Sequence, residues 1–456
     1  MVNGIGKNVY IVGIGGISLS AIAVILKNFG HEVCGFDKVK SEQTEKLTHL
    51  GVKVCYLEKE IDLSGVDTIV YSSAICEDFT ALRLARENGL SILTRAECLS
   101  LISNEYSRLV AVAGSHGKTT TTAILTTILG HSGMGFTSHI GGELVEYDNN
   151  VLQCGENDVF LTEACEYKKN FLSLSPDISV VLNLDLDHVD IYNNQEEITD
   201  AFLEFSNKVK KGGVLVINID SIGADKIVQR TNKDKRIITF SIKNTNADYY
   251  IKYCEHDGTF KVDVYHKNNI VGNFMLKNYF EHNLYNALAG IIVAIELGVG
   301  YKFIEEGVRI FKGVKRRFEE VGEINGAKVV LDYAHHPQEI KSVLTASKVH
   351  TKGKVYVIFQ PHTYSRTKYF WSDFIKSLSI ADNLIMYPIY PAREKAIMGI
   401  SSKRMAEDLR RINKVCYYSD NMEEIKSYLG YFVSKDDLVL VLGAGNIEKF
   451  RLVLNQ

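Results

Sequence analysis

The sequence predicts an α/β protein of three domains, and three observations carry that prediction. The chain has 456 residues, enough for roughly three domains of about 150 residues each. Short apolar runs typical of buried strands alternate with amphipathic helical stretches, which indicates βαβ units and parallel sheets. Several of these apolar runs end in glycine turns or polar residues, where open α/β sheets bind their ligands.

The first domain, residues 1–107, is expected to be Rossmann-like. A strand at 8–14 runs into a glycine turn and a helix at 18–30, which ends at Gly30. Further strand-like runs follow in the same alternating pattern at 31–37, 52–57, 67–73 and 90–95. This domain is predicted to bind a nucleotide sugar or a dinucleotide.

The central domain, residues 108–314, is expected to be an ATPase domain of the P-loop type. Its buried strands are predicted at 108–114, 158–164, 178–188 and 212–220. Residues 235–272 differ, because their alternating pattern and the Asp257-Gly258 pair favour a small antiparallel sheet of hairpins. The apolar stretch 282–298 then predicts a helix that ends at Gly298.

The last domain, residues 315–456, is expected to be Rossmann-like again. The charged, glycine-containing stretch 313–326 is typical of a linker. Four buried-strand candidates follow at 327–335, 354–362, 383–390 and 437–445. The C-terminal domain is therefore predicted to be a third α/β unit.

The stretch VAVAGSHGKTTTTAIL, residues 110–125, combines a strand, a glycine turn and the start of a helix. Backbone N–H groups of such a turn bind anionic oxygens. Lys118 adds a positive charge for the terminal phosphates, and the Thr119 hydroxyl can hold Mg²⁺. The strict P-loop pattern needs glycine where this chain has Val112, so the loop is a shortened one. Binding of a nucleoside triphosphate is predicted.

Two further residues are candidate magnesium ligands. Glu163 and His188 each follow a predicted strand, which would bring both to the edge of the sheet that carries the loop. Alone, Glu163 reads as an exposed glutamate and His188 as a core histidine. Histidine is also an unusual ligand for Mg²⁺, which prefers oxygen.

The glycine run IVGIGGISLSA, residues 11–21, follows a strand, opens a helix and is followed by Asp37 at the end of the next strand. This is close to a dinucleotide fingerprint, with Ser18 where the third glycine would stand. The same run suits any diphosphate. Local evidence alone leaves a nicotinamide cofactor and a nucleotide sugar open.

Charge and composition exclude several classes of function. The formal net charge of −3 gives no chain-wide basic field for nucleic acid. No apolar run reaches 18 residues and no secretion signal is present, so a cytoplasmic protein with no membrane partner is expected. The eight cysteines contain no CxxC pair, which argues against a zinc ribbon.

In order along the chain, the glycine run, the GSHGKTT loop, LNLDLDHVD, HNLYNALA, GVKRRFE, DYAHHP and FQPHTYSRT resemble the Mur ligases. These are ATP-dependent enzymes that add amino acids to the peptidoglycan precursor. The shortened loop is that family's own form of the P-loop, and the resemblance covers nearly the whole chain. Within the family, the motifs are most similar to the branch that joins L-alanine to UDP-N-acetylmuramate.

The resemblance implies a role for each matching position. Lys118, Glu163, His188 and His336 would be catalytic, and Thr119, Glu163 and His188 would hold Mg²⁺. The implied ATP-binding residues are Gly114, Ser115, His116, Gly117, Lys118, Thr119, Thr120, His282, Asn283, Asn286, Arg317 and Asp332. The implied UDP-sugar residues are Gly15, Gly16, Ser18, Asp37 and Ser73. The implied residues on the side of the incoming amino acid are His335, Arg366, Arg393 and Glu394.

The resemblance also implies the reaction: ATP and Mg²⁺ activate the sugar carboxylate as an acyl phosphate, and L-alanine then displaces phosphate. His188, His335 or His336 would accept the proton of the amine. A monomer or weak homodimer is expected, with a C-terminal domain that closes when substrates bind. Thr363 departs from the arginine of many relatives, and no residue is assigned as a carbamylated lysine. The alternatives are a recycling ligase for a whole tripeptide and a nucleotide-binding switch without ligase activity.

Overall fold

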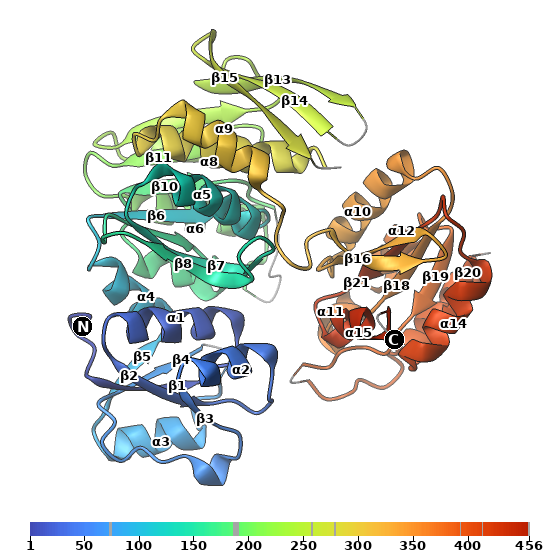
Figure 1. Cartoon of the computed structure of the whole chain (residues 1–456), viewed down its shortest axis with the longest axis horizontal. Helices are drawn as coiled ribbons and strands as arrows, with labels where there is room; N and C mark the ends of the chain where they lie inside the picture. The colour runs from blue at the N-terminus through green and yellow to red at the C-terminus, as the bar shows by residue number, and fades with distance from the viewer. Residues whose placement is uncertain are drawn as a thin grey trace. The chain divides into compact units, whose positions relative to one another are not determined.

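The computed structural model describes residues 1–72, 75–185, 191–256, 259–277, 280–392, 394–412 and 414–454. They form two compact units. Residues up to 312 belong to the first unit, except two short segments around 255–259 and 277–280, which join residues 313–456 in the second. Three β-sheets divide the chain further, which confirms the predicted three-domain α/β fold (Figure 1). The exact boundaries at 107/108 and 314/315 stay a prediction.

The N-terminal sheet is parallel throughout, with strand order β3-β2-β1-β4-β5. Alternate residues of β1 point to opposite faces: Val9 and Ile11 pack with α1, α2 and α4, while Tyr10 and Val12 pack with α3. Helices on both faces are what a parallel sheet requires. The elements are β1 (Asn8–Val12), α1 (Ile17–Asn28), β2 (Glu32–Phe36), α2 (Glu42–His49), β3 (Lys53–Cys55), β4 (Thr68–Tyr71), α3 (Thr80–Glu87), β5 (Ser91–Thr94) and α4 (Arg95–Ser103).

The central sheet has ten strands in the order β15-β14-β13-β12-β11-β10-β6-β9-β7-β8. Helices α5, α8 and α9 cover the face that carries Val110 and Val112, and α6 and α7 cover the other. The strands are β6 (Arg108–Ala113), β7 (Phe136–Leu144), β8 (Asn149–Cys154), β9 (Val159–Glu163), β10 (Ile178–Val181), β11 (Val214–Asn218), β12 (Arg236–Ser241), β13 (Tyr249–His256), β14 (Thr259–His266) and β15 (Asn269–Lys277). The helices are α5 (Lys118–Ser132), α6 (Gln195–Asn207), α7 (Ala224–Arg230), α8 (His282–Glu296) and α9 (Tyr301–Ile310).

The predicted antiparallel hairpins are β13, β14 and β15, and they extend one end of the central sheet. The connection is a short parallel pairing of β12 with β13. Strands joined by two residues pair antiparallel, and Lys267 and Asn268, between β14 and β15, both have positive φ as a tight hairpin turn needs. The predicted turn at Asp257-Gly258 lies outside the described residues.

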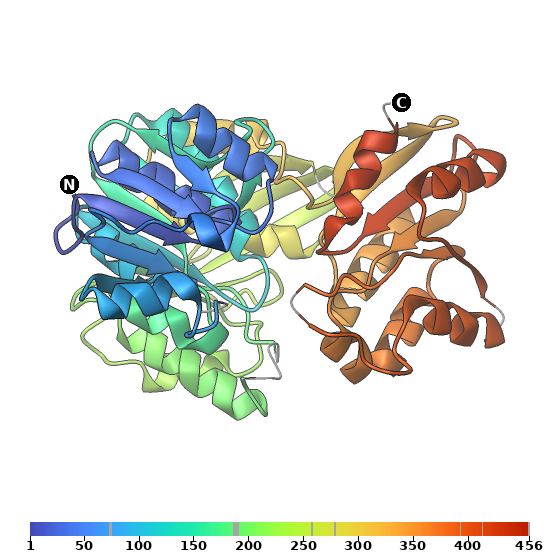
Figure 2. The ribbon, with the colours of Figure 1, turned by 90° about the horizontal axis from the view of Figure 1, so that it is seen from below.

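The C-terminal sheet has the order β16-β17-β21-β18-β19-β20, parallel except for the β16–β17 pair. Along β18, Val355, Val357 and Phe359 pack with α10, α12 and α13, and Tyr356 and Ile358 with α14 and α15, so helices lie on both faces (Figure 2). The strands are β16 (Glu319–Ile324), β17 (Ala327–Asp332), β18 (Val355–Phe359), β19 (Asn383–Met386), β20 (Val415–Tyr418) and β21 (Leu438–Leu442). The helices are α10 (Pro337–His350), α11 (Tyr364–Tyr369), α12 (Trp371–Leu378), α13 (Ser402–Arg411), α14 (Met422–Phe432) and α15 (Phe450–Leu454).

The stretch 313–326, expected to be a linker, is only partly one. Residues 319–324 form β16, an edge strand that pairs antiparallel with β17. A sheet edge tolerates charged side chains because one side of the strand faces solvent. The composition therefore looked like a linker while the backbone is part of the sheet.

The first two sheets share one hydrophobic core. The ring of Tyr106 stacks on Phe160 of β9 at 5.1 Å and meets Phe29, just after α1, edge-on at 6.0 Å. This packing ties the N-terminal and central sheets into one unit.

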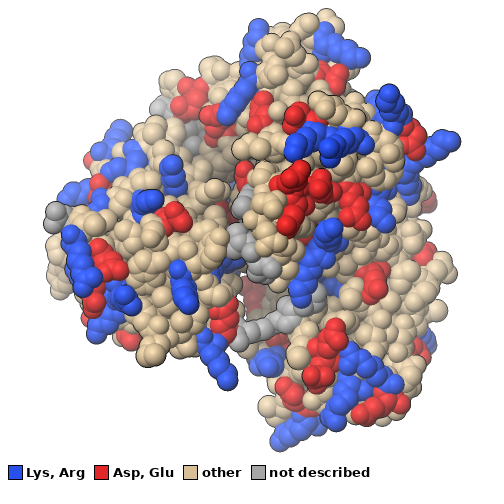
Figure 3. All heavy atoms as spheres, turned by 180° about the vertical axis from the view of Figure 1, so that it is seen from behind, with Lys and Arg blue, Asp and Glu red and all other residues tan. Residues whose placement is uncertain are grey.

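Lys and Arg side chains are interspersed with Asp and Glu side chains over the face shown in Figure 3. None of the described helices combines the length and the apolar character that crossing a bilayer would take.

Candidate active site

The phosphate loop connects β6 to α5, as the sequence predicts. Gly117 precedes the helix with φ 86°, and Gly114 has φ 149°; both conformations favour glycine. A Cβ atom on Gly117 would overlap Asn286 Oδ1, so this position has no room for a side chain. No side chain caps the N-terminus of α5. Its first N–H groups are thus available to an anion.

The end of β10 holds the loop in place. Asn183 Oδ1 accepts a hydrogen bond from His116 N at 2.7 Å, and Asn183 Nδ2 donates to His116 O at 2.9 Å. Ser115 Oγ donates to Asp185 O at 2.7 Å. The backbone at Ser115 and His116 is therefore fixed by the neighbouring strand, and sequence reasoning missed Asn183. Its position at a strand end was the available signal.

Lys118, the first residue of α5, forms an ion pair with Glu166. Its Nζ lies 3.0 and 2.9 Å from the two carboxylate oxygens and also donates to Gly114 O at 2.5 Å. Glu166 is fully buried. Burial acts to lower the pKa of Lys118, but the Glu166 carboxylate outweighs it and the pKa is raised. The lysine is thus held charged beside the loop; sequence reasoning missed Glu166.

Thr119 and Glu163 come together as candidate metal ligands. Thr119 Oγ1 donates to Glu163 Oε2 at 3.0 Å, and Gly141 N donates to Glu163 Oε1 at 2.5 Å. A hydroxyl and a carboxylate beside a phosphate loop are the oxygen donors that Mg²⁺ prefers, so these residues fit that ion. His188 lies outside the described residues.

Helix α8 supplies the asparagines predicted to bind ATP. Asn286 Nδ2 donates to Asn283 Oδ1 at 2.8 Å, and Thr121 Oγ1 donates to Asn286 Oδ1 at 3.3 Å. Both asparagines are buried against α5, and His282 is exposed at the start of α8. Asn286 therefore supports the loop at Gly117.

The N-terminal glycine run forms a tight turn between β1 and α1. Gly13 has φ 81°, and Gly15 N donates to Asp37 Oδ2 at 2.9 Å. A Cβ on Gly15 would lie 2.9 Å from the same oxygen. Gly16 precedes α1 without a side-chain cap. The predicted Gly15, Gly16 and Asp37 are thus brought together, and Ser73 lies outside the described residues.

Ser18 points from α1 to the central domain. Its Oγ lies 2.8 Å from His139 Nε2, and Arg95 Nη1 donates to it at 3.1 Å. His139 Nδ1 lies 2.9 Å from Thr162 Oγ1. Burial, reinforced by the Arg95 charge, lowers the pKa of His139 to about 3, so this ring is neutral. Sequence reasoning singled out neither Arg95 nor His139.

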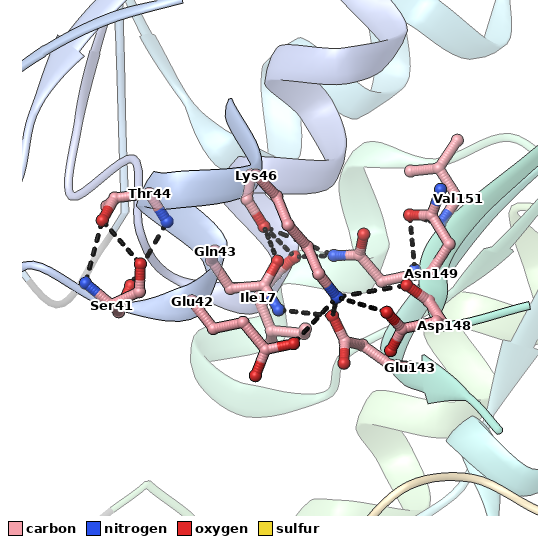
Figure 4. A network of polar contacts seen from close by, with 12 residues as sticks. Ile17, Ser41, Glu42, Gln43, Thr44, Lys46, Glu143, Asp148, Asn149 and Val151 are labelled. Carbon is pink, nitrogen blue, oxygen red and sulfur yellow. Dashed lines mark hydrogen bonds and ion pairs between the residues drawn. The ribbon is translucent and has the colours of Figure 1, made fainter. Parts of the chain in front are cut away.

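A second contact between these two domains centres on Lys46 of α2 (Figure 4). Its Nζ donates to the buried Glu143 at 2.6 Å and pairs with Glu42 at 3.0 Å and Asp148 at 3.5 Å. Gln43 Nε2 also donates to Glu143 at 2.7 Å. The three carboxylates have the spacing of a metal site, but the Lys46 ammonium lies among them. The cluster is an ion-pair network.

In the C-terminal unit, Arg317 and Asp332 lie close enough to interact. Burial raises the pKa of Asp332 to about 6, against the Arg317 charge and hydrogen bonds from Ala334 N and Phe318 N, both at 2.8 Å. The Arg317 guanidinium lies 5.1 Å from the Tyr333 ring centroid. Arg316 and Phe318 have positive φ (63° and 53°), a strained backbone of the kind found at functional turns.

The predicted amino-acid side is partly assembled. The rings of His335 and His362 are 5.8 Å apart, and Arg366 Nη1 donates to His362 Nδ1 at 3.3 Å. Glu394 accepts hydrogen bonds from Ser365, next to Arg366. Thr363, where arginine was expected, caps α11 by accepting from Arg366 N at 3.4 Å. Arg393 lies outside the described residues.

The two neighbouring histidines differ in their hydrogen bonds. His335 Nδ1 donates to Tyr333 O at 3.0 Å, which leaves its Nε2 as the basic nitrogen of the neutral ring. His336 caps α10: its Nδ1 accepts from Gln338 N at 3.3 Å, and its ring packs edge-on against Phe370. His336 thus uses its basic nitrogen as a helix cap.

Family models match all three parts of the chain. Residues 8–107 match the Mur ligase family, catalytic domain; residues 112–294 match the Mur ligase middle domain; residues 316–445 match the Mur ligase, glutamate ligase domain.

Individual relatives match over nearly their whole length. The UDP-N-acetylmuramate–L-alanine ligase of Caldanaerobacter subterraneus subsp. tengcongensis is 40% identical over 97% of each chain. That of Clostridium acetobutylicum is 39% identical over 98% of this chain and 97% of its own. The crystal structure of the UDP-N-acetylmuramate–alanine ligase from Thermotoga maritima has a TM-score of 0.82 and 25% identity, with 98% of both chains covered. A murein peptide ligase from Psychrobacter arcticus shares the fold, with a TM-score of 0.73 and 23% identity over 99% of this chain and 98% of its own.

Proposed function

The chain belongs to the Mur ligase family, and from that premise we propose that it joins L-alanine to UDP-N-acetylmuramate with ATP as the phosphoryl donor. One observation carries the proposal: a phosphate loop with Lys118 and the Thr119–Glu163 pair lies in one compact unit with a second, diphosphate-type glycine turn. A two-substrate ligase needs both sites. A nucleotide switch or a dehydrogenase needs only one of them.

The first chemical step is phosphoryl transfer. An oxygen of the sugar's carboxylate attacks the γ-phosphorus of ATP, the bond to the β-phosphate oxygen breaks, and an acyl phosphate and ADP form. Two anions must approach each other, so positive charge near the γ-phosphate is the main requirement. Lys118 supplies one such charge, and the N-terminal N–H groups of α5 add a partial charge. Mg²⁺ bound at Thr119 and Glu163 would neutralise phosphate charge, as the ion does in other phosphoryl-transfer enzymes.

The second step forms the amide bond. The neutral amine of L-alanine attacks the acyl carbon, and inorganic phosphate leaves from the tetrahedral intermediate while the amine loses a proton. Of the two predicted acceptors in the C-terminal unit, His335 and His336, His335 is the better one, because its Nε2 is the basic nitrogen. Burial lowers the pKa of His335, which keeps the ring neutral at pH 7. The predicted role of His336 receives no support from its hydrogen bonds, and that of His188 stays a prediction.

The substrates are best supported by the relatives. The two curated relatives at 40% and 39% identity are both named as L-alanine ligases. The match to a murein peptide ligase, at 23% identity, supports the shared fold alone. A reaction that consumes ATP and a nucleotide sugar belongs in the cytoplasm, as an early step of peptidoglycan synthesis that supports cell shape and division.

Phosphate release tests the proposal. Purified protein is given ATP, Mg²⁺ and UDP-N-acetylmuramate, and single amino acids or the cell-wall tripeptide are added one at a time. We expect release only with L-alanine, together with a product heavier by one alanine. Release only with the tripeptide would assign the chain to the recycling branch. Release that does not depend on the sugar would contradict ligation altogether.

A further inference from the structure

Arg95 carries a positive charge that the described residues leave without a carboxylate partner. It is the first residue of α4 and half-buried. In the described part of the chain, its guanidinium makes one side-chain hydrogen bond, to Ser18 Oγ, and no ion pair. Arginine is rarely buried unless it is paired, because desolvation of the charge is unfavourable. The guanidinium therefore keeps most of its N–H donors for another acceptor.

The side chain lines a small cleft between the N-terminal and central domains. Glu163, Cys165 and Asn170 of the central domain line the same cleft. The Asn170 amide has no hydrogen-bond partner among the residues the structure describes. Glu163 also pairs with Thr119 beside the phosphate loop. Two polar donors thus line a cleft that reaches the candidate metal site.

Arg95 is fixed relative to the central domain through Ser18. The Ser18 hydroxyl accepts from Arg95 and lies 2.8 Å from His139 Nε2, which is also 3.3 Å from Ser18 O. His139 Nδ1 lies 2.9 Å from Thr162 Oγ1, and Thr162 directly precedes Glu163 in β9. The cleft that Arg95 lines together with Glu163 and Cys165 also places the guanidinium beside the central domain.

We propose that Arg95 binds the carboxylate of the sugar substrate and directs it toward the phosphate loop. This inference rests on the proposed function, which requires that carboxylate to reach the γ-phosphate. The glycine turn at Gly13–Gly16 suits the diphosphate and opens the same helix that carries Ser18. The acyl end of the substrate then has to cross from that turn to Glu163, and Arg95 lies between them. A guanidinium fork matches a carboxylate in bidentate geometry and reduces its repulsion from ATP.

Two nucleotide sugars test this role. UDP-N-acetylglucosamine has the same nucleotide and sugar as UDP-N-acetylmuramate but lacks the lactyl group and its carboxylate. Both are titrated calorimetrically against wild type, Arg95→Gln and Arg95→Lys, with Mg²⁺ and a non-hydrolysable ATP analogue present. For Arg95→Gln we expect affinity for UDP-N-acetylmuramate to fall about 30-fold, while that for UDP-N-acetylglucosamine stays within about threefold. Arg95→Lys keeps the positive charge but not the bidentate guanidinium, so it should lose part of the preference for UDP-N-acetylmuramate over UDP-N-acetylglucosamine.

The controls separate binding from folding and from the parent proposal. Arg83→Gln, at an exposed arginine of α3, should change neither affinity, and thermal unfolding checks that each variant folds. Equal weakening of both sugars by Arg95→Gln would show a purely structural role and overturn the inference. An unchanged preference of Arg95→Gln for UDP-N-acetylmuramate over UDP-N-acetylglucosamine would also overturn the inference. If wild type ligates L-alanine and prefers UDP-N-acetylmuramate, such results refute the role of Arg95 alone. If wild type shows neither property, the proposed function fails and the inference fails with it.

Discussion

Lys118 and Glu166 form a buried ion pair in which one ammonium contacts both carboxylate oxygens, at 2.9 and 3.0 Å. Glu166 has no exposed surface, and the Lys118 ammonium offsets part of the cost of burying its charge. The pair explains how a half-enclosed lysine stays protonated beside a phosphate loop. When Lys118 contacts ATP, its ammonium therefore has to give up part of its contact with Glu166.

Glu166→Gln is expected to shift the pH dependence of ATP use. Burial acts to lower the pKa of Lys118 and the Glu166 carboxylate raises it. Without that carboxylate the pKa of Lys118 falls, so the charged form is lost at lower pH. kcat/KM for ATP, measured from pH 6.5 to 10, should decline on the alkaline side at a lower pH than in wild type. Glu204→Gln, in the exposed Lys169–Glu204 pair, is the matched control. Superimposable profiles would show that Glu166 does not set the charge of Lys118.

Lys118→Met is expected to abolish ligation while sugar binding persists. Loss of the charge at the γ-phosphate should lower kcat by about 1,000-fold or more, as with other phosphoryl-transfer cations. The Gly13–Gly16 turn is in another domain, so the Kd for UDP-N-acetylmuramate should change little. Removing the Lys118 charge from this buried ion pair should also lower the free energy of unfolding by about 3–5 kcal/mol. The double variant Lys118→Met/Glu166→Gln should recover part of that stability and none of the activity. Equal loss of activity and sugar binding would contradict the separation of the two sites.

Glu163→Gln is expected to raise the Mg²⁺ requirement. Glutamine keeps the shape, can accept from Gly141 N through its one carbonyl oxygen and can donate to Thr119 Oγ1, but it provides a weaker ligand without charge. The Mg²⁺ concentration that gives half-maximal phosphate release should rise about tenfold or more. Glu156→Gln, at an exposed residue outside the site, should leave it unchanged. Unaltered Mg²⁺ dependence in Glu163→Gln would remove this residue from the metal site.

Short runs of apolar residues predicted most of the strands, because the strands of a parallel sheet are buried on both faces and are apolar along their whole length. β1, β6, β10 and β21 all follow this rule. Strand β16 was missed since it is an edge strand with charged residues. β7, with two glycines and a buried histidine and glutamate, lacks the apolar pattern for a different reason: its polar side chains contact the N-terminal domain.

Sequence motifs predicted the residues of the phosphate loop. They did not predict the partners of the loop that are distant in sequence. The loop glycines and Lys118 form a local pattern. Glu166 and Asn183 are 48 and 67 residues from the loop positions that they contact. No spacing rule connects them, and only the strand order brings them together. His336, which the motif assigned a chemical role, caps α10 in the structure, and its chemical role stays a prediction.

Asp332→Asn is expected to flatten the pH dependence of stability of the C-terminal unit. The pKa of Asp332 rises from 3.8 to about 6 on folding, so the folded state binds the proton more tightly than the unfolded state. This carboxyl's contribution is therefore most favourable below pH 4 and is lost as the pH rises to 6. The wild type should lose up to about 3 kcal/mol relative to Asp332→Asn across that range. The single tryptophan, Trp371, lies in this unit and reports its urea transition. Parallel curves for both proteins would contradict the raised pKa.

Gly117→Ala and Gly133→Ala form a matched pair at the two ends of α5. Both glycines have left-handed backbones, with φ 86° and 76°, so alanine strains each by about 1 kcal/mol. They differ in their surroundings: a Cβ at Gly117 would overlap Asn286 Oδ1, whereas nothing lies within 4 Å of one at Gly133. We expect Gly133→Ala to lower only the melting temperature, by a few degrees. Gly117→Ala should in addition raise KM for ATP at least about tenfold, because Asn286 or the loop must move and the first N–H groups of α5 move with it. Equal effects of the two variants on KM would mean that backbone strain alone, and not the contact between α8 and the loop, controls ATP binding.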